Sequence, residues 1–245
     1  MYSSFSSIYN TLMGDVDYNA RTEYICNLFE KFDKMPTLLL DLACGTGGFS
    51  NCFADKGVSV IGVDISPEML SVARESVNGR DILYLCQSAA ELDLYGTVDG
   101  AICCMDSVNH ITDYDELCEA FKKVSLFLEK DRLFIFDVNT IYKHEQVLGN
   151  NTFVIDEDNV YCVWDNSYDS NNKITAINLD FFTTEDGVNY VRTEDYIEEH
   201  AYTNKELESA LESAGFEILA VYAEMEENPV RFDTERAFYV TRKVK

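Results

Sequence analysis

The chain has 245 residues, 47% of them hydrophobic, and a formal net charge of −25 from 19 basic and 44 acidic side chains. This composition is typical of a globular protein, and the length allows one large domain or two small ones. The negative charge repels phosphate backbones and anionic lipid headgroups, which argues against nucleic acid and membrane surfaces as partners.

Two further features bear on location and metal content. Residues 1–10 have neither the basic nor the apolar part of a secretion signal, and no run of about 18 apolar residues exists, so we expect a cytoplasmic protein. The eight cysteines include no CxxC pair and are expected to be reduced, buried thiols. The three histidines show no HxH or HExxH spacing, so we expect no metal site.

The first half of the chain alternates strand-like and helical segments. Residues 17–32 have the period of an amphipathic helix, and the apolar runs at 37–42 and 58–63 flank a segment of helical length. Further strands are expected at 82–86, 98–104 and 132–138, with a helix over 114–128. This alternation predicts an α/β fold with a doubly wound, mostly parallel sheet.

The second half of the chain begins with a different hydrophobic pattern. Residues 152–202 alternate apolar and polar side chains, with turn signals at 169–172 and 186–187, which predicts an antiparallel meander. A capping box at Thr203 and Glu206 opens a helix that Gly215 ends, and residues 216–222 and 237–241 are expected to form a closing hairpin.

We therefore expect one domain from residues 1–150 and 203–245, interrupted by a β subdomain at 151–202. The subdomain is a natural lid or acceptor-binding element. Its aromatic residues could equally form its own core; they are Tyr161, Trp164, Phe181, Phe182 and Tyr190.

The segment LLDLACGTGGF at 39–49 runs from a strand through a glycine turn into a helix. Its small residues fit both a dinucleotide fingerprint and a nucleoside-binding loop, so the glycines alone do not decide between them. Asp41, beside the turn, would repel a pyrophosphate and favour a cationic amino group, which S-adenosylmethionine carries. Asp64 ends the second strand, where a carboxylate can accept hydrogen bonds from ribose hydroxyls. Ser66 and the proline after it begin a helix that places Met69 in its first turn.

With these motifs in place, the sequence resembles the class I S-adenosylmethionine-dependent methyltransferases. The resemblance rests on DLACGTGG at 41–48, VDISPEML at 63–70 and ESAGFEIL at 212–219. The chain is also similar to smaller bacterial members with DVDY at 15–18, CCMDSVNHI at 103–111 and an insertion after FDVN at 136–139. Many of these lack an assigned substrate, so the resemblance is specific for the cofactor and weak for the acceptor. It implies a Rossmann-like fold.

The resemblance also implies roles for individual residues. Asp41, Gly45 and Gly47 would line the methionine part of the cofactor, together with Thr46, and Ala43 replaces the commoner first glycine. Asp64 would bind the ribose. Ile65 and Met69 would sandwich the adenine, whose edge would meet Ser88 and Ala89. Met105 would lie beside the sulfonium, and Tyr18 and Arg21 could close over the methionine carboxylate.

Asp106 and His110 are the candidate catalytic residues, because either could remove a proton from the acceptor at the carboxyl end of the fourth strand. Plainer interpretations remain open at this stage: Asp106 as a helix cap, His110 as a structural histidine, Met69 as core filling, and Tyr18 and Arg21 as surface residues of a helix.

Four functions remain in competition. The first is a methyltransferase for a small-molecule acceptor, with S-adenosylmethionine as cofactor and S-adenosylhomocysteine as product, in which the methyl group moves by direct displacement. The second is a methyltransferase for RNA or protein, for which no basic stripe is visible. The third is a non-catalytic module that binds S-adenosylmethionine, and the fourth and weakest is an NAD-dependent enzyme. The oligomeric state is not indicated by the sequence.

Overall fold

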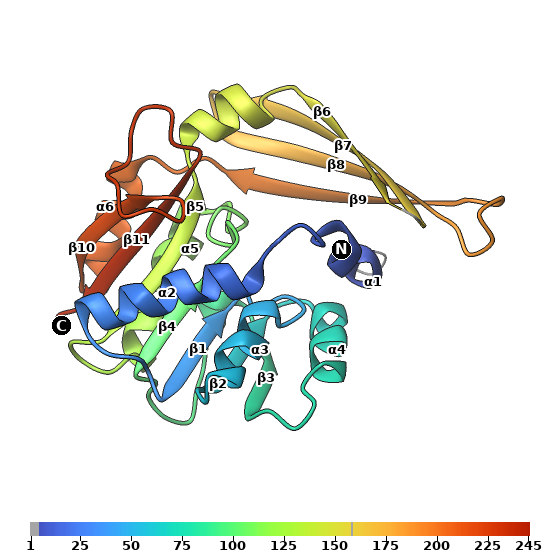
Figure 1. The fold of residues 1–245 in the computed structure, drawn as a ribbon. Helices are drawn as coiled ribbons and strands as arrows, with labels where there is room; N and C mark the ends of the chain where they lie inside the picture. The colour runs from blue at the N-terminus through green and yellow to red at the C-terminus, as the bar shows by residue number, and fades with distance from the viewer. Residues whose placement is uncertain (1–4, 158) are drawn as a thin grey trace.

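The computed structural model describes residues 5–157 and 159–245 (Figure 1). Seven strands form the larger sheet: β1 (Leu38–Leu42), β2 (Ser59–Asp64), β3 (Ile82–Cys86), β4 (Gly100–Cys103), β5 (Leu133–Asn139), β10 (Phe216–Ala223) and β11 (Arg236–Lys243). Their order is β10-β11-β5-β4-β1-β2-β3, and β11 runs antiparallel to both of its neighbours while the other recorded pairings are parallel. The predicted doubly wound sheet with its closing hairpin is therefore confirmed.

Helices cover both faces of this sheet (Figure 1). They are α2 (Tyr18–Phe32), α3 (Gly48–Asp55), α4 (Pro67–Glu75), α5 (Tyr114–Phe127) and α6 (Asn204–Ala214). The chain also contains α1 (Phe5–Leu12), which contacts α4 and the second sheet, a short 3-10 turn at Ala89–Glu91 and a π-helical segment at Lys143–Leu148. None of the helices in the described part of the chain has the length and apolar character that a membrane crossing requires.

Strand β5 shows how the sequence creates two cores. All seven of its residues are buried, and successive side chains point to opposite faces of the sheet. Phe134 and Phe136 pack with Phe121 of α5 on one face, while Ile135 joins the cluster that contains Phe29 of α2 on the other. The apolar run at 133–136 is what a sheet covered on both faces requires, and the buried polar residues Asp137 and Asn139 follow toward the carboxyl end of the strand.

The second sheet contains β6 (Thr152–Glu157), β7 (Val160–Asp169), β8 (Ile174–Thr183) and β9 (Val191–His200), paired antiparallel in chain order. This confirms the inserted meander. Figure 1 shows the sheet arching above the larger one, with α1 beneath it near α4. Ile8 of α1 packs with Cys162, Ile177 and Phe181 from the inner face of the meander.

The aromatic residues of the meander divide between its two faces. Phe181 is fully buried in the cluster with Ile8, and Trp164 packs against that cluster. Tyr161, Phe182 and Tyr190 instead line a separate depression with two acidic neighbours. The core expectation holds for Phe181 and Trp164, and a role of these aromatic residues in acceptor binding stays a prediction.

Three local features differ from the sequence-based expectation. Helix α1 was not predicted; it has only eight residues, and its order depends on packing against the meander. The π-helical turn at Lys143–Leu148 was also missed. Strand β4 is shorter than the expected 98–104, since Val98 forms only an isolated bridge and the backbone leaves the sheet after Cys103.

Candidate functional site

The turn after β1 is held open by three residues in the left-handed conformation: Ala43 (φ 55°), Gly45 (φ 54°) and Gly47 (φ 81°). Glycine adopts this conformation without the steric cost that alanine pays, so Ala43 carries local strain. Gly47 is the N-cap of α3, and a methyl group there would lie 2.2 Å from the hydroxyl of Tyr84. The turn thus leaves backbone groups at the start of α3 open to a ligand.

Asp41 lies beneath this turn and is only 1% exposed. The hydroxyl of Ser50 donates to its Oδ2 at 2.5 Å, and within the described residues no cation pairs with it. Burial raises the pKa of Asp41 to about 7. A buried carboxyl without a cation can accept the ammonium group of a ligand as its missing partner.

Asp64 joins the turns that follow β1 and β2. Its Oδ2 accepts from the backbone N–H of Gly45 at 2.8 Å, and its Oδ1 accepts from the backbone N–H of Ser66 at 2.8 Å. The side chain also lines the cavity described below. Each carboxylate oxygen can accept more than one hydrogen bond, so the remaining capacity is available to ligand hydroxyls.

Near Asp64 the wall of that cavity is formed by Ile65, Met69, Ser88 and Ala89. Ser66 caps α4 through its Oγ, which accepts from the backbone N–H of Met69 at 3.1 Å. Met69 is buried, whereas Ile65 is 63% exposed. Ser88 caps the short turn that begins at Ala89. These residues follow the carboxyl ends of β2 and β3, which lie at the same edge of the sheet.

Met105 and Asp106 form a strained turn after β4. Both are left-handed, with φ of 60° and 53°, and their backbone N–H groups donate to the carboxylate of Asp137 at 2.7 and 3.2 Å. Helix α5 begins later, with Asp113 as its N-cap, so Asp106 is not the cap of that helix. Strain held by a buried carboxylate is common at functional sites.

Arg236 fixes Asp106 from the other side. Its guanidinium pairs with Asp106 at 2.7 Å and also with Asp137, and all three groups are largely removed from solvent. Burial opposes ionisation of Asp106, but the charges of Arg236 and Lys143 outweigh it and hold the pKa of that carboxyl well below its usual range. Asp106 is therefore a carboxylate at neutral pH.

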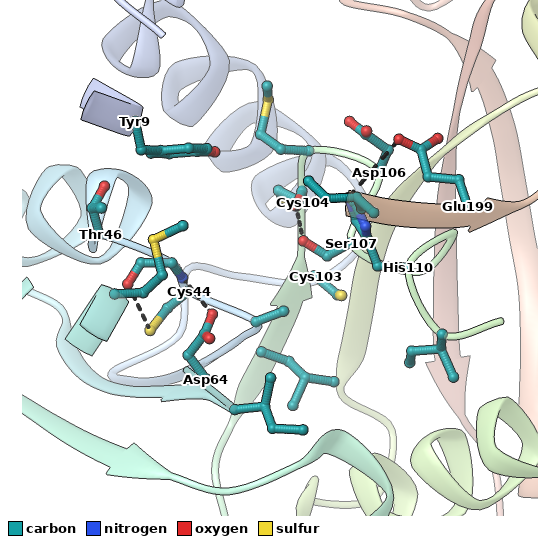
Figure 2. A pocket seen from close by; sticks show the side chains of 18 of the residues that line it. Tyr9, Cys44, Thr46, Asp64, Cys103, Cys104, Asp106, Ser107, His110 and Glu199 are labelled. Atoms are coloured by element: carbon teal, nitrogen blue, oxygen red, sulfur yellow. Dashed lines mark hydrogen bonds and ion pairs between the residues drawn. The ribbon is translucent and has the colours of Figure 1, made fainter. Parts of the chain in front are cut away.

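Glu199, at the end of β9, brings a second carboxyl group to Asp106. Figure 2 shows the two side chains pointing toward each other above His110. The Oε1 of Glu199 lies 3.9 Å from the Nε2 of His110, and its Oε2 accepts from the side-chain amide of Asn139 at 3.0 Å. Burial, reinforced by the negative charge of Asp106, raises the pKa of Glu199. Asp106, His110 and Glu199 thus meet from two different sheets.

One cavity of about 540 Å³ connects these parts. It runs from the turn after β1 and Asp64 to Asp106, His110 and Glu199, below the meander and α1 (Figure 2). Parallel sheets bind ligands at this edge, where the strand order reverses between β1 and β4. The volume falls within the range of roughly 300–1,000 Å³ that small-molecule sites occupy.

The structure places most of the sequence-predicted residues on the wall of this cavity: Tyr18, Asp41, Ala43, Gly45, Thr46, Asp64, Ile65, Met69, Ser88, Ala89, Met105, Asp106 and His110. Two predicted residues lie outside the wall. Gly47 is the N-cap of α3. Arg21 donates to Glu224 at 2.6 Å instead of facing the cavity.

Several residues on the wall were not predicted. Tyr9 faces the cavity from α1, and burial raises its pKa well above the usual value. Thr46 Oγ1 donates to the side-chain oxygen of Asn10 at 2.8 Å, which ties α1 to the turn after β1. The sequence offers no signal that singles out Arg236 or Glu199, because their strands contain several other charged residues.

Known proteins resemble the whole chain. The methyltransferase domain family matches residues 39–131. YqeM of Bacillus subtilis, which carries methyltransferase in its name, is 31% identical over 248 residues, covering 100% of this chain and 98% of that protein. An S-adenosylmethionine-dependent methyltransferase from Clostridium acetobutylicum superposes with a TM-score of 0.90 at 34% identity, covering 100% and 99% of the two chains.

A more distant structure shares the fold alone. CalS10 of Micromonospora echinaspora, an amino pentose methyltransferase solved with S-adenosylmethionine bound, is 18% identical with a TM-score of 0.76, covering 94% of this chain and 92% of that one. The full-length similarity to YqeM and to the Clostridium enzyme, together with the glycine turn, the carboxylates after β1 and β2 and the strand order, decides the family. The chain belongs to the class I S-adenosylmethionine-dependent methyltransferases.

Proposed function

We propose that this methyltransferase acts on a small molecule held between the carboxyl edge of the large sheet and the inner face of the meander. The supporting observation is the single cavity, whose walls contain both the cofactor-type residues and the side chains of β7, β8 and β9. In this proposal residues 151–202 are the acceptor-binding subdomain, and residues 1–150 with 203–245 form the cofactor-binding domain.

The cofactor end of the cavity has donors and acceptors that suit S-adenosylmethionine. Asp41 would pair with the ammonium group of the methionine part, and Asp64 would accept hydrogen bonds from the ribose hydroxyls. Ile65 and Met69 would enclose the adenine, with Ser88 and Ala89 at its edge. Ala43, Gly45 and Thr46 would lie along the methionine chain, beside Tyr18.

When bound, S-adenosylmethionine supplies a methyl carbon on a positively charged sulfur, which is a good leaving group. The work of the protein is then to hold a nucleophile in line with that carbon and to exclude water. Met105 and Asp106, fixed by Asp137, would set the position where acceptor and methyl group meet. The meander and α1 would close this position from above.

Proton removal at the acceptor falls to Asp106, His110 or Glu199, which meet at this end. Asp106 is a poor base, because its pKa is held well below the usual range by Arg236 and Lys143. It is better suited to orient a donor group of the acceptor. The removal of the proton is therefore assigned to His110 or Glu199.

Two experiments test the proposal. Isothermal titration with S-adenosylhomocysteine should show binding that Asp64→Ala weakens strongly, because the variant loses ribose hydrogen bonds to a charged acceptor worth about 1.5–3 kcal/mol each. The variant also removes the acceptor for the Gly45 N–H, so circular dichroism should confirm that it is folded.

The second experiment identifies the acceptor class. A cell extract is incubated with radiolabelled S-adenosylmethionine and the protein, then separated into small molecules, RNA and protein. Label should accumulate in the small-molecule fraction and be absent with Asp64→Ala. Label that enters only RNA or only protein would refute a small-molecule acceptor.

A further inference from the structure

Glu199 has an oxygen that faces the cavity and lacks a close partner. Its side chain is only 4% exposed, and Asn139 occupies Oε2. The contact recorded for Oε1 is His110 Nε2 at 3.9 Å, which is too long for a hydrogen bond. A buried carboxylate in this state is costly unless a ligand supplies a donor.

The basic side chains near Glu199 are paired with other groups. Arg236 pairs with Asp106 and Asp137, and Lys143 Nζ donates to the side-chain oxygen of Asn139 at 3.0 Å. His144 lies 3.7 Å from Glu199, but burial lowers the pKa of His144 to about 4, so it carries no charge at neutral pH. Apart from His110 and His144, no basic side chain in the described part of the chain lies at ion-pair distance from Glu199.

A network of buried hydrogen bonds surrounds Glu199 and fixes its position. The strand of Glu199 pairs with β8, and there the hydroxyl of Thr175 forms a hydrogen bond of 2.8 Å with His144 Nδ1. Asn109, fully buried, donates to the backbone oxygens of Asn139 and His200. This network connects both sheets, so the direction of the Glu199 carboxyl is set by several buried contacts.

The wall next to Glu199 is apolar. Side chains from the inner face of the meander line it, together with Leu148 of the π-helical turn; they are Ile155, Cys162, Trp164, Ile177, Leu179 and Ile197. The indole N–H of Trp164 already donates to Asn166, so the ring offers only its apolar surface and edge. A ligand that fills this space needs an apolar body.

We propose that the acceptor is an amine with an apolar body, and that Glu199 and Asp106 together bind its ammonium group. Glu199 is then a catalytic residue that takes the proton from the acceptor, while Asp106 orients it. The assignment rests on the proposed function, because it names the substrate class for the same cavity.

The proposed step conserves atoms and charge. Glu199 takes one proton from the ammonium group, which leaves a neutral nitrogen with a free electron pair. That pair forms the bond to the methyl carbon, the bond between carbon and sulfur breaks, and its electrons stay on sulfur as a thioether. The positive charge has moved from sulfur to the methylated nitrogen, and the proton on Glu199 is later released to solvent.

A divalent metal is the competing occupant of the same place. One polar atom from each of Asp106, His110 and Glu199 lies within 4.8 Å of the others, a spacing that a cation could bridge. Arg236, however, already pairs with Asp106 at 2.7 Å, and its fixed charge would repel a dication at this position. An ammonium group, with one charge and several donors, suits the cluster better.

The test uses three probes with the same body and different head groups: 2-phenylethylamine, 2-phenylethanol and 3-phenylpropionate. Each is titrated into the protein loaded with S-adenosylhomocysteine. We expect the amine to bind at least about tenfold more tightly than the alcohol, and the acid to bind most weakly. Glu199→Gln should reduce the difference between amine and alcohol to about twofold or less.

Glu198→Gln is the matched control. It removes the same charge from the adjacent residue, whose exposed side chain accepts from Tyr196 on the outer face of the meander. This variant should keep the full preference for the amine. With S-adenosylmethionine in place of the product, the amine probe should become methylated, and Glu199→Gln should lower that rate with unchanged S-adenosylhomocysteine affinity.

Several results would overturn the proposal. These are equal binding of amine and alcohol, no amine binding at millimolar concentration, or an amine preference that survives Glu199→Gln. Zinc binding that Glu199→Gln abolishes and that excludes the amine would assign the cluster to a metal. Label in RNA or protein in the extract experiment would instead refute the small-molecule acceptor itself, so the two failures are distinguishable.

Discussion

The buried acid Asp41 should make cofactor binding depend on pH. In the free protein its pKa is about 7 because of burial, so it is largely protonated below neutrality. The ammonium group of the ligand favours the carboxylate form and lowers that pKa. Binding below pH 7 must therefore expel one proton from Asp41, whereas binding above pH 7 expels none.

The size of the pH effect on affinity follows from the one proton that Asp41 must release. Below the free-state pKa of about 7, affinity for S-adenosylhomocysteine should fall tenfold for each pH unit, or about 1.4 kcal/mol. At pH 5 the loss relative to pH 8 should be about 100-fold, or about 2.7 kcal/mol. Above neutrality the affinity should be nearly constant.

Isothermal titration across this pH range, in buffers of different ionisation enthalpy, measures both the affinity and the released protons. Asp41→Asn should bind more weakly at pH 8 and lose most of the pH dependence. Burial also raises the pKa of Asp64, so a smaller slope from that residue should remain.

Asp81→Asn is the control, because Asp81 accepts from Ser59 at 2.5 Å in a similar pair at the opposite end of the sheet. It should behave as the wild type does. The reasoning is refuted if wild-type affinity is flat between pH 5 and pH 8, or if Asp41→Asn keeps the full slope.

The remaining predictions concern stability, measured by urea unfolding. Without a ligand, Asp41 binds a proton more tightly in the folded state than in the unfolded state. Its contribution to the free energy of unfolding therefore falls as the pH rises from about 4 to about 7. Asp41→Asn should be more stable than the wild type at pH 8, by up to about 4 kcal/mol, and equally stable at pH 4. Gly47→Ala should cost at least about 1–3 kcal/mol more than Gly57→Ala; both glycines have positive φ, but a methyl group has open space at Gly57 and would lie 2.2 Å from a tyrosine hydroxyl at Gly47. Equal losses would contradict the steric argument. Arg236→Met should lower the free energy of unfolding by about 3–5 kcal/mol, because it leaves two buried carboxylates without their cation; a change below about 1 kcal/mol would show that they protonate freely.

Most residues that the sequence assigned to the cofactor line the cavity, because the elements that carry them are close together in the chain. The turn after β1, the carboxylates at the ends of β1 and β2 and the cap of α4 lie within about one βαβ unit, so their places follow from short-range patterns. Asp41 and Asp64 were identified by charge and position, and both line the cavity. Their contacts with the cofactor stay predictions.

Helix α1 and the π-helical turn show where local patterns fail. The apolar residues of α1 do have helical spacing, but eight residues are too few for a stable isolated helix, and α1 is ordered by Ile8 against the meander and by the bond between Asn10 and Thr46. Short helices gain most of their stability from such tertiary contacts, which no window of sequence contains.

The family, the parallel sheet with its inserted meander and the cofactor edge were therefore determined by the sequence itself. Only the tertiary structure placed Glu199 beside Asp106 and His110, and Arg236 between Asp106 and Asp137. Glu199 comes from the meander, so its place depends on how the two sheets pack across the cavity, whereas Arg236 reaches Asp137 through the pairing of β11 with β5. Charge pairs of this kind have no sequence spacing, because the fold sets their distance.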